Sequence, residues 1–231
     1  LSEELKQAAD ARTGRPEKSS VVRNGVSTEQ FYYIDQAQAK LNISNPIESR
    51  AIVSVGSLIY RKGFDLLIQA LQRLRTIPEL ENCRLYIIGS EGPEGDYRKK
   101  LFDQVGQLGL QNAIEFVGQV PNDELIYWYN ACDVFCLASR GEGSPNVLTE
   151  AIACGCPAVS TDVGSAREIV ESEPDLGICV DSVSADALYD GLSKVLLRGN
   201  DRERNACIFS RYSWDWCAKN VLPVYQSAID H

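Results

Sequence analysis

The chain has 231 residues, of which 44% are hydrophobic and 24% are charged, as is typical of a globular protein. Its net charge of −9 argues against nonspecific binding to nucleic acid, which depends on neutralising phosphates, so we expect no nucleic-acid partner. The only histidine is His231, the last residue, which argues against a Ser-His-Asp or Cys-His nucleophile and against a histidine-bearing metal site.

Cysteine spacing and the lack of membrane or export signals indicate the compartment. The pairs Cys154-x-Cys156 and Cys132-x3-Cys136 have no matching partners elsewhere, so no zinc site is expected. No apolar run approaches the roughly 18 residues that span a bilayer, and no secretory signal opens the chain. We therefore expect a cytoplasmic protein with reduced cysteines. Because the chain contains no methionine, we also expect it to be a piece of a longer protein.

Strand and helix patterns alternate along the chain. Residues 1–20 are polar and predict a short helix and a linker. Strands are expected at 51–55, 84–89, 113–118, 133–139, 157–161 and 177–180, and helices at 64–74, 94–109, 121–131, 145–154, 165–171, 184–197, 201–210 and 213–230. This order indicates an α/β fold of Rossmann-like type, with a parallel sheet and helices on both of its faces.

Ligands of such sheets bind beyond the carboxyl ends of the strands. The loops expected there are 56–63, 89–95, 118–121, 139–145 and 161–165, and each contains glycine, proline or both. Loop glycines are usually turn residues, so each loop alone is a weak signal.

The stretch 140–157, RGEGSPNVLTEAIACGCP, carries the most specific pattern. Ser144 is a suitable N-cap and Pro145 a suitable first residue for a helix that begins there. Gly141 and Gly143 allow the backbone to approach a ligand closely. A helix start with free amide groups at the ligand edge of the sheet predicts a phosphate site.

Two glutamates flank this helix start. Glu150 lies roughly 7–8 Å along the helix axis from Pro145, about the reach from a nucleotide's diphosphate to its ribose. A carboxylate there can accept hydrogen bonds from both ribose hydroxyls. Glu142 precedes the helix and would reach whatever is attached beyond the phosphates. The alternative is that both acids are solvated surface residues.

A dinucleotide-binding loop is a rival interpretation. Gly141 and Gly143 match the first two glycines of G-x-G-x-x-G, and Asp162 follows about 20 residues later, where such folds place a ribose-binding acid. However, the third glycine is replaced by Asn146. The pattern also falls after about four expected strands instead of in the first strand-to-helix turn, which disfavours NAD binding.

These features resemble the C-terminal, donor-binding domain of retaining glycosyltransferases of the GT-B fold, family 4 type. That family has two acids separated by seven residues, here EGSPNVLTE, followed by AIACGCPAVSTDVGSAREIV. The resemblance extends to VVRNGVSTEQF, SVGSLIYRKGFDLLIQAL, GQVPNDELIYWYNACDVFCLAS and SWDWCAKNVLPVY, in the family's order. It covers residues from about 20 to 228.

The resemblance implies roles for the matching positions. Glu150 would bind the ribose, Glu142 would contact the donor sugar near the reacting carbon, and Lys62 would neutralise the diphosphate and assist catalysis. Arg61 would replace an arginine that the family has after the glycine of its first loop, since that position is Ser57 here. Donor contacts would also come from Gly56, from the segment Ser144, Pro145, Asn146 and Val147, and, for the base, from the backbone of Gly118, Gln119 and Val120.

The family also implies a domain plan and a reaction. Residues 1–20 would be an interdomain helix and linker, residues 21–212 the nucleotide-sugar-binding domain, and residues 213–231 a helix that crosses back to an N-terminal acceptor domain outside this chain. The protein would transfer a hexosyl group from a UDP- or GDP-sugar, with no cofactor and no metal. This chain alone would be inactive, and the acceptor domain could associate peripherally with a membrane. A non-catalytic sugar-nucleotide-binding module and a sugar-nucleotide epimerase are the alternatives.

Overall fold

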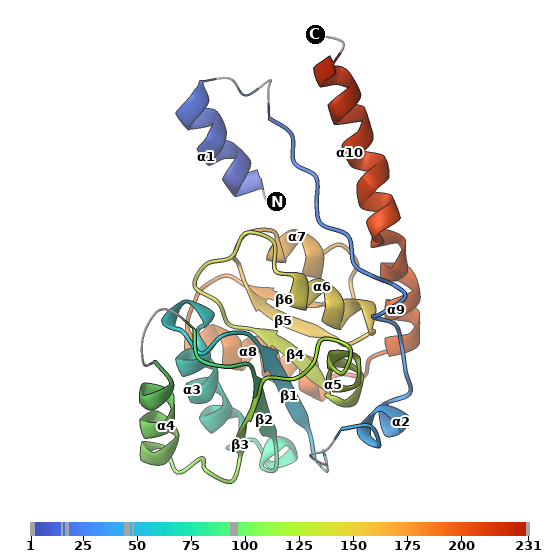
Figure 1. Ribbon diagram of the computed structural model, residues 1–231. Helices are drawn as coiled ribbons and strands as arrows, with labels where there is room; N and C mark the ends of the chain where they lie inside the picture. Colours follow the sequence, from blue (N-terminus) through green and yellow to red (C-terminus); the bar gives the residue numbers. More distant parts are fainter. Residues whose placement is uncertain are drawn as a thin grey trace.

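A parallel sheet of six strands forms the centre of the fold (Figure 1). The computed structural model describes residues 3–14, 16, 19–43, 47, 49–92 and 97–229. The strands are β1 (Ala51–Val55), β2 (Arg84–Ile88), β3 (Ile114–Gly118), β4 (Val134–Leu137), β5 (Ala158–Thr161) and β6 (Gly177–Val180). Their order is β3-β2-β1-β4-β5-β6 with parallel pairing throughout. This is the strand order of a Rossmann fold, and it confirms the predicted fold class.

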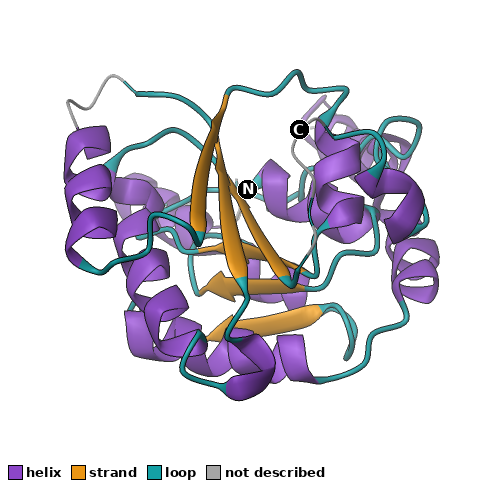
Figure 2. Cartoon of the chain, turned by 90° about the horizontal axis from the view of Figure 1, so that it is seen from below, coloured by secondary structure: helices purple, strands orange, loops and turns teal. Residues whose placement is uncertain are grey.

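Helices cover both faces of the sheet (Figure 2). One face packs against α3 (Phe64–Leu74), α4 (Tyr97–Gln107) and α8 (Ala185–Leu197), and the other against α2 (Gln36–Lys40), α5 (Leu125–Ala131), α6 (Asn146–Ala153), α7 (Ala166–Val170) and α9 (Arg202–Phe209). Successive side chains of a strand point to opposite faces, so Ile52 joins the first core while Ala51 and Val53 join the second.

The site is positioned by the point at which the strand order reverses. Strand β1 pairs with β2 on one side and with β4 on the other, so the loops that follow β1 and β4 leave the sheet side by side. The backbone amide of Arg140 donates to the carbonyl oxygen of Arg61 at 2.7 Å and joins the two loops. Gly63 has a φ of 66°, and a Cβ atom there would overlap the carbonyl oxygen of Ala138. Only glycine allows this close approach.

Several helix boundaries differ from the prediction. Helix α6 begins at Asn146 with Pro145 at its N-cap, so the assignment of Ser144 as N-cap and Pro145 as first helical residue is wrong. Pro145 has a ψ of 96°, which is extended, and no side chain caps α6. Helix α5 begins at Leu125 instead of 121, and α2 was not predicted. The predicted start of α4 at 94 lies outside the described residues, since α4 is described from Tyr97.

The two terminal helices extend away from the sheet on the same side (Figure 1). Helix α1 (Glu3–Thr13) fulfils the prediction of a short helix in the first 20 residues. Helix α10 (Trp214–Ile229) exposes Leu222, Tyr225 and Ile229. Within the part of the chain that the structure describes, no helix has both the length and the apolar character needed to cross a membrane.

Candidate functional site

A cluster of charged side chains occupies the junction of the loops after β1 and β4. The Glu142 carboxylate accepts hydrogen bonds from Lys62 Nζ at 2.7 Å and from Arg61 Nη1 at 3.2 Å. Ser139 Oγ donates to the same carboxylate at 2.7 Å. The Glu142 side chain is 11% exposed and that of Lys62 is 16% exposed, so this ion pair is largely shielded from solvent. The structure therefore brings Arg61 and Lys62 together with Glu142, which lies about 80 residues further along the chain.

Glu150 has a different environment on the next helix. The hydroxyl of Tyr129, which is fully buried on α5, donates to the Glu150 carboxylate at 3.0 Å. Burial raises the pKa of Glu150 above its usual value, and the hydrogen bond from Tyr129 offsets only part of this shift. Neither Glu142 nor Glu150 is thus a solvated surface residue.

An open cavity of about 180 Å³ lies beside Glu150. Its lining includes Gly25 and Gln30 from the segment before the first strand, and Asn122 and Asn146 from the loop edge of the sheet. The side-chain Nε2 of Gln30 donates to the backbone carbonyl oxygen of Asn122 at 3.1 Å. Gln30 and Asn122 carry no pattern that predicts a site, because only the fold brings them next to Glu150.

The start of α6 lies beside the charged cluster. Asn146 is exposed and its Oδ1 accepts a hydrogen bond from Asn24 Nδ2 at 3.0 Å, while Val147 and Ser144 are half-buried. Pro145 is buried, so of this predicted segment it is the residue least able to contact a ligand. No side chain caps α6, and the first amides of a helix have no partner within the helix, so this helix start suits an anion.

The loop after β5 supports this segment. The backbone amide of Ser165 donates to the carbonyl oxygen of Gly143 at 3.1 Å. Gly164 has a φ of 56°, and a Cβ atom there would overlap the same carbonyl oxygen. The position of Gly143, and with it the approach to α6, therefore depends on a glycine at 164.

The remaining predicted residues lie along the same edge of the sheet. Gly56 follows β1, and a Cβ atom there would lie 3.1 Å from the Lys62 side chain. Gly118 lines a second cavity of about 290 Å³ beyond β2 and β3. Gln119 is exposed and its Nε2 donates to Ser90 Oγ at 2.9 Å, and Val120 is half-buried. Gly118 thus faces a different cavity from Glu150, and the loop 118–122 runs between the two.

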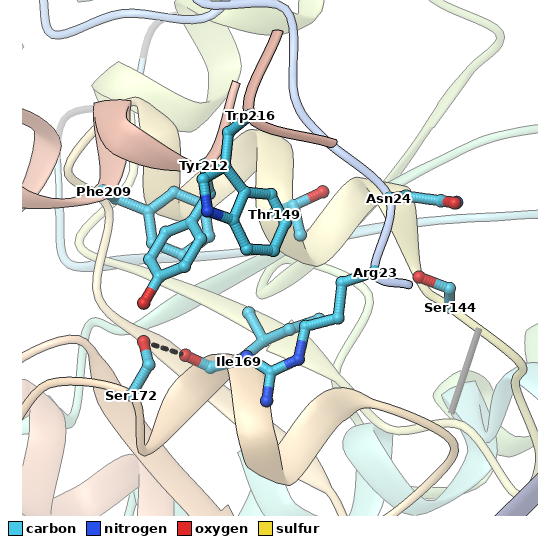
Figure 3. A pocket seen from close by; sticks show the side chains of 9 residues that line it. All are labelled: Arg23, Asn24, Ser144, Thr149, Ile169, Ser172, Phe209, Tyr212 and Trp216. Atoms are coloured by element: carbon cyan, nitrogen blue, oxygen red, sulfur yellow. Dashed lines mark hydrogen bonds between the residues drawn. The ribbon is translucent and has the colours of Figure 1, made fainter. Parts of the chain in front are cut away.

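A third cavity is too small for an organic ligand (Figure 3). It has a volume of about 20 Å³ and lies between Arg23, Ser144, Thr149 and the aromatic side chains of Tyr212 and Trp216. That volume holds about one water molecule. This cavity is a packing gap between the segment around Arg23, α6 and the start of α10.

The structure also bears on the dinucleotide alternative. The Gly141-x-Gly143 loop follows β4, the fourth strand in the chain, so it is not the first strand-to-helix turn that binds a dinucleotide. Arg167 forms ion pairs with Asp162 at 2.8 Å, Glu171 at 2.8 Å and Asp181 at 2.9 Å. Asp162 therefore already has a partner on the protein surface. Among the described residues, no three His, Cys, Asp or Glu side chains gather in a way that could hold a metal ion.

Comparison with known proteins identifies the family. Residues 36–208 match the family described as glycosyl transferases group 1. This chain belongs to that family. It is 33% identical over its whole length to an uncharacterized glycosyltransferase of Methanocaldococcus jannaschii, and 30% identical over 98% of its length to a D-inositol 3-phosphate glycosyltransferase of Acidothermus cellulolyticus. It spans 60% of the first protein and 52% of the second.

Solved structures match the fold. Sucrose-phosphate synthase from Thermosynechococcus elongatus has a TM-score of 0.80 at 23% identity, over 98% of this chain and 57% of that one. HepE of Anabaena, in complex with UDP and glucose, has a TM-score of 0.77 at 23% identity, over 98% of this chain and 62% of that one. At these identities the likeness extends to the fold alone. It confirms the expected fold, a Rossmann-like parallel sheet that matches structures of GT-B glycosyltransferases.

Proposed function

We propose that this chain is the nucleotide-sugar-binding domain of a retaining glycosyltransferase of family 4 type, which transfers a hexosyl group from a UDP- or GDP-sugar. One observation carries the proposal most directly. Lys62, Arg61 and the start of α6 converge where the strand order reverses, and Glu150 lines a cavity beside them. A diphosphate needs such cations and free amides, and a ribose needs such an acceptor.

The diphosphate would bind between Lys62, Arg61 and the first turn of α6, with Gly56, Ser144 and the amides of Asn146 and Val147 close to it. When the bond between the sugar and the phosphate breaks, negative charge develops on the leaving phosphate. Fixed cations and helix amides stabilise that charge more strongly in a partly buried site than in water. Lys62 and Arg61 therefore supply binding as well as leaving-group stabilisation.

The rest of the donor would extend in two directions from the diphosphate. The ribose hydroxyls would donate to Glu150, and the base would lie near the backbone of Gly118, Gln119 and Val120. The hexose would lie near Glu142, which would contact it close to the reacting carbon. Donor binding would need no cofactor and no metal, since the two cations neutralise the diphosphate.

The site that binds the acceptor would lie on a domain outside this chain. The chain spans 60% or less of the two relatives described above. Residues 1–20 would connect to that domain, residues 21–212 would bind the donor, and residues 213–231 would cross back to it through the exposed apolar side chains of α10. The whole protein would be cytoplasmic, with the acceptor domain able to contact a membrane surface. This chain alone would bind donor without transferring it.

A thermal-shift and calorimetry screen of UDP-, GDP- and ADP-sugars tests the proposal. We expect saturable binding of one nucleotide class, and a loss of roughly ten- to a hundredfold in affinity on Lys62→Ala, the usual effect of losing a charge-assisted contact. Lys194→Ala, an exposed lysine on α8, is the matched control and should bind like the parent. Failure of all the nucleotide-sugars to bind would overturn the proposal.

Two further measurements test metal independence and the need for a second domain. Adding EDTA should leave the donor affinity unchanged, and a large loss that Mg²⁺ or Mn²⁺ restores would contradict metal independence. The purified chain should give no sugar transfer to an added acceptor, and measurable transfer would contradict the need for a second domain.

A further inference from the structure

The side chain of Arg140 contacts the short helical turn that carries the two cations. The turn comprises Tyr60, Arg61 and Lys62, and it ends at Gly63. Arg140, on the loop after β4, donates from Nη1 to the carbonyl oxygen of Tyr60 at 2.7 Å. The Arg140 guanidinium also lies over the Tyr60 ring, 3.9 Å from its centre. This one side chain thus contacts both the backbone and the side chain of the first residue of the turn.

Arg140 is itself fixed by an acid on the other side of the turn. Its Nη1 and Nη2 donate to the two carboxylate oxygens of Asp65 at 2.8 and 2.6 Å, a two-pronged pairing that fixes the plane of the guanidinium. Both side chains are 20% exposed. Burial by itself would raise the pKa of Asp65, but the hydrogen bonds from Arg140 and Tyr97 hold that pKa below its usual value. Asp65 lies in the first turn of α3, so the contact joins α3 to the loop after β4.

The same loop carries Glu142 two residues further along. Arg140 therefore links the segment that holds the acid to the turn that holds the cations. The hydrogen bonds of its Nη1 and Nη2 go to oxygens of Tyr60 and Asp65, so these groups already have partners within the protein. Arg61 and Lys62, in contrast, face the site. Any effect of Arg140 on a phosphate ligand would then pass through the position of the turn.

We propose that Arg140, fixed by Asp65, is a positioning residue that sets where Lys62 meets the donor diphosphate. This inference rests on the proposed function. A lysine at position 140 would keep the charge, but it lacks the planar fork and the stacking surface of arginine. The turn would then be held mainly by the backbone hydrogen bond from residue 140 to Arg61, and Lys62 would spend less time in the position that suits the diphosphate.

A double-mutant cycle tests this coupling. UDP and GDP are the probes, measured by calorimetry on the parent chain, Arg140→Lys, Lys62→Ala and the double variant. We expect Arg140→Lys to weaken binding of the accepted nucleotide roughly five- to twentyfold in the parent, and less than about threefold in the Lys62→Ala background, because coupled residues are not additive. Asp65→Asn should show the same pattern with a smaller loss, and it provides the test if Arg140→Lys does not fold.

Arg73→Lys is the matched control. Arg73 also pairs with an aspartate, Asp186, and lies over an aromatic ring, that of Tyr189 at 4.3 Å, but it does so between α3 and α8. The Arg73→Lys variant should have a lower thermal stability than the parent but the same nucleotide affinity. Equal losses from Arg140→Lys with and without Lys62, or parent-like binding by Arg140→Lys and Asp65→Asn, would overturn this inference alone. Failure of the parent to bind UDP or GDP would overturn the proposed function together with it.

Discussion

Glu142, on the loop before α6, and Glu150, within α6, have opposite electrostatic surroundings. Glu142 is paired with Lys62 and Arg61 and accepts a third hydrogen bond from Ser139, so its charge is compensated within the protein. Glu150 is partly buried and accepts a hydrogen bond from the neutral hydroxyl of Tyr129, and its pKa is raised by burial. A compensated carboxylate must give up its partners before it can act on a ligand. A carboxylate with a raised pKa gains when a ligand brings hydrogen-bond donors.

This difference changes what the two residues should do when the ligand binds. On the proposed function, the diphosphate and Glu142 compete for the same two cations. Ribose hydroxyls, in contrast, would supply Glu150 with the donors that its surroundings lack. The same substitution of an amide for the acid should therefore have opposite effects at the two positions.

The largest effect is expected at Glu150. Glu150→Gln should weaken binding of the accepted nucleoside diphosphate by roughly five- to a hundredfold, the range for losing a hydrogen-bonded charged acceptor. Calorimetry on the variant measures it, with Glu79→Gln, an exposed acid, as the control. Unchanged affinity would show that Glu150 does not bind the ribose.

A smaller effect of opposite sign is expected at Glu142. Glu142→Gln should strengthen binding of the nucleoside diphosphate by roughly three- to tenfold, because Lys62 and Arg61 lose a competing charge worth about 1 kcal/mol. The gain should be smaller for the intact nucleotide-sugar, which would lose a contact to its hexose. Parallel losses for both ligands would mean that the ion pair positions the cations instead of competing for them.

The pH dependence of stability should separate the two acids further. The folded-state pKa of Glu150 lies above the unfolded value, so the folded protein holds this proton more tightly. Ionisation then destabilises the parent relative to Glu150→Gln as the pH rises from about 4.5 through the folded pKa. We expect Glu150→Gln to melt a few degrees higher than the parent at pH 7, and the difference should be smaller at pH 4. For a chain of this length, 1 kcal/mol of stability corresponds to roughly 2–4 °C in melting temperature. Equal differences at both pH values would contradict the raised pKa.

The smallest effect is expected at Gln119. Its side chain is exposed and bonded to Ser90, and the base is proposed to contact the backbone here. Gln119→Ala should therefore change nucleotide affinity by no more than about twofold, as for surface substitutions in general. A tenfold loss measured by calorimetry would assign base recognition to this side chain.

Much of this architecture could be predicted from the sequence. The strand 51–55 and the alternation of strands with helices identified the parallel sheet, because buried strands and amphipathic helices leave distinct periods. The pairing of Lys62 with Glu142 could not be predicted, because it depends on β1 and β4 being neighbours, which no local pattern specifies. The contacts of Arg140 with Tyr60 and Asp65 could not be predicted for the same reason.

The errors have local physical causes. Ser144 and Pro145 match the residue preferences of an N-cap and a first helical position, but Pro145 has extended backbone angles here, so α6 begins one residue later than those preferences predict. Helix α2 has only five residues, too few for a helical period to be recognised. Asn122 and Gln30 carry no pattern of their own, and only the folded chain brings them to Glu150.

The pairing of β1 with β4 also determines when the site forms during folding. Strands β1 and β2 are close in the chain, but Lys62 and Glu142 are 80 residues apart. Bringing such distant segments together costs loop entropy before their contacts can compensate for it, which makes these pairings slow. The site is therefore assembled only when the two halves of the sheet have joined. A nucleotide that binds there would select fully folded molecules and protect them against unfolding, in proportion to its concentration.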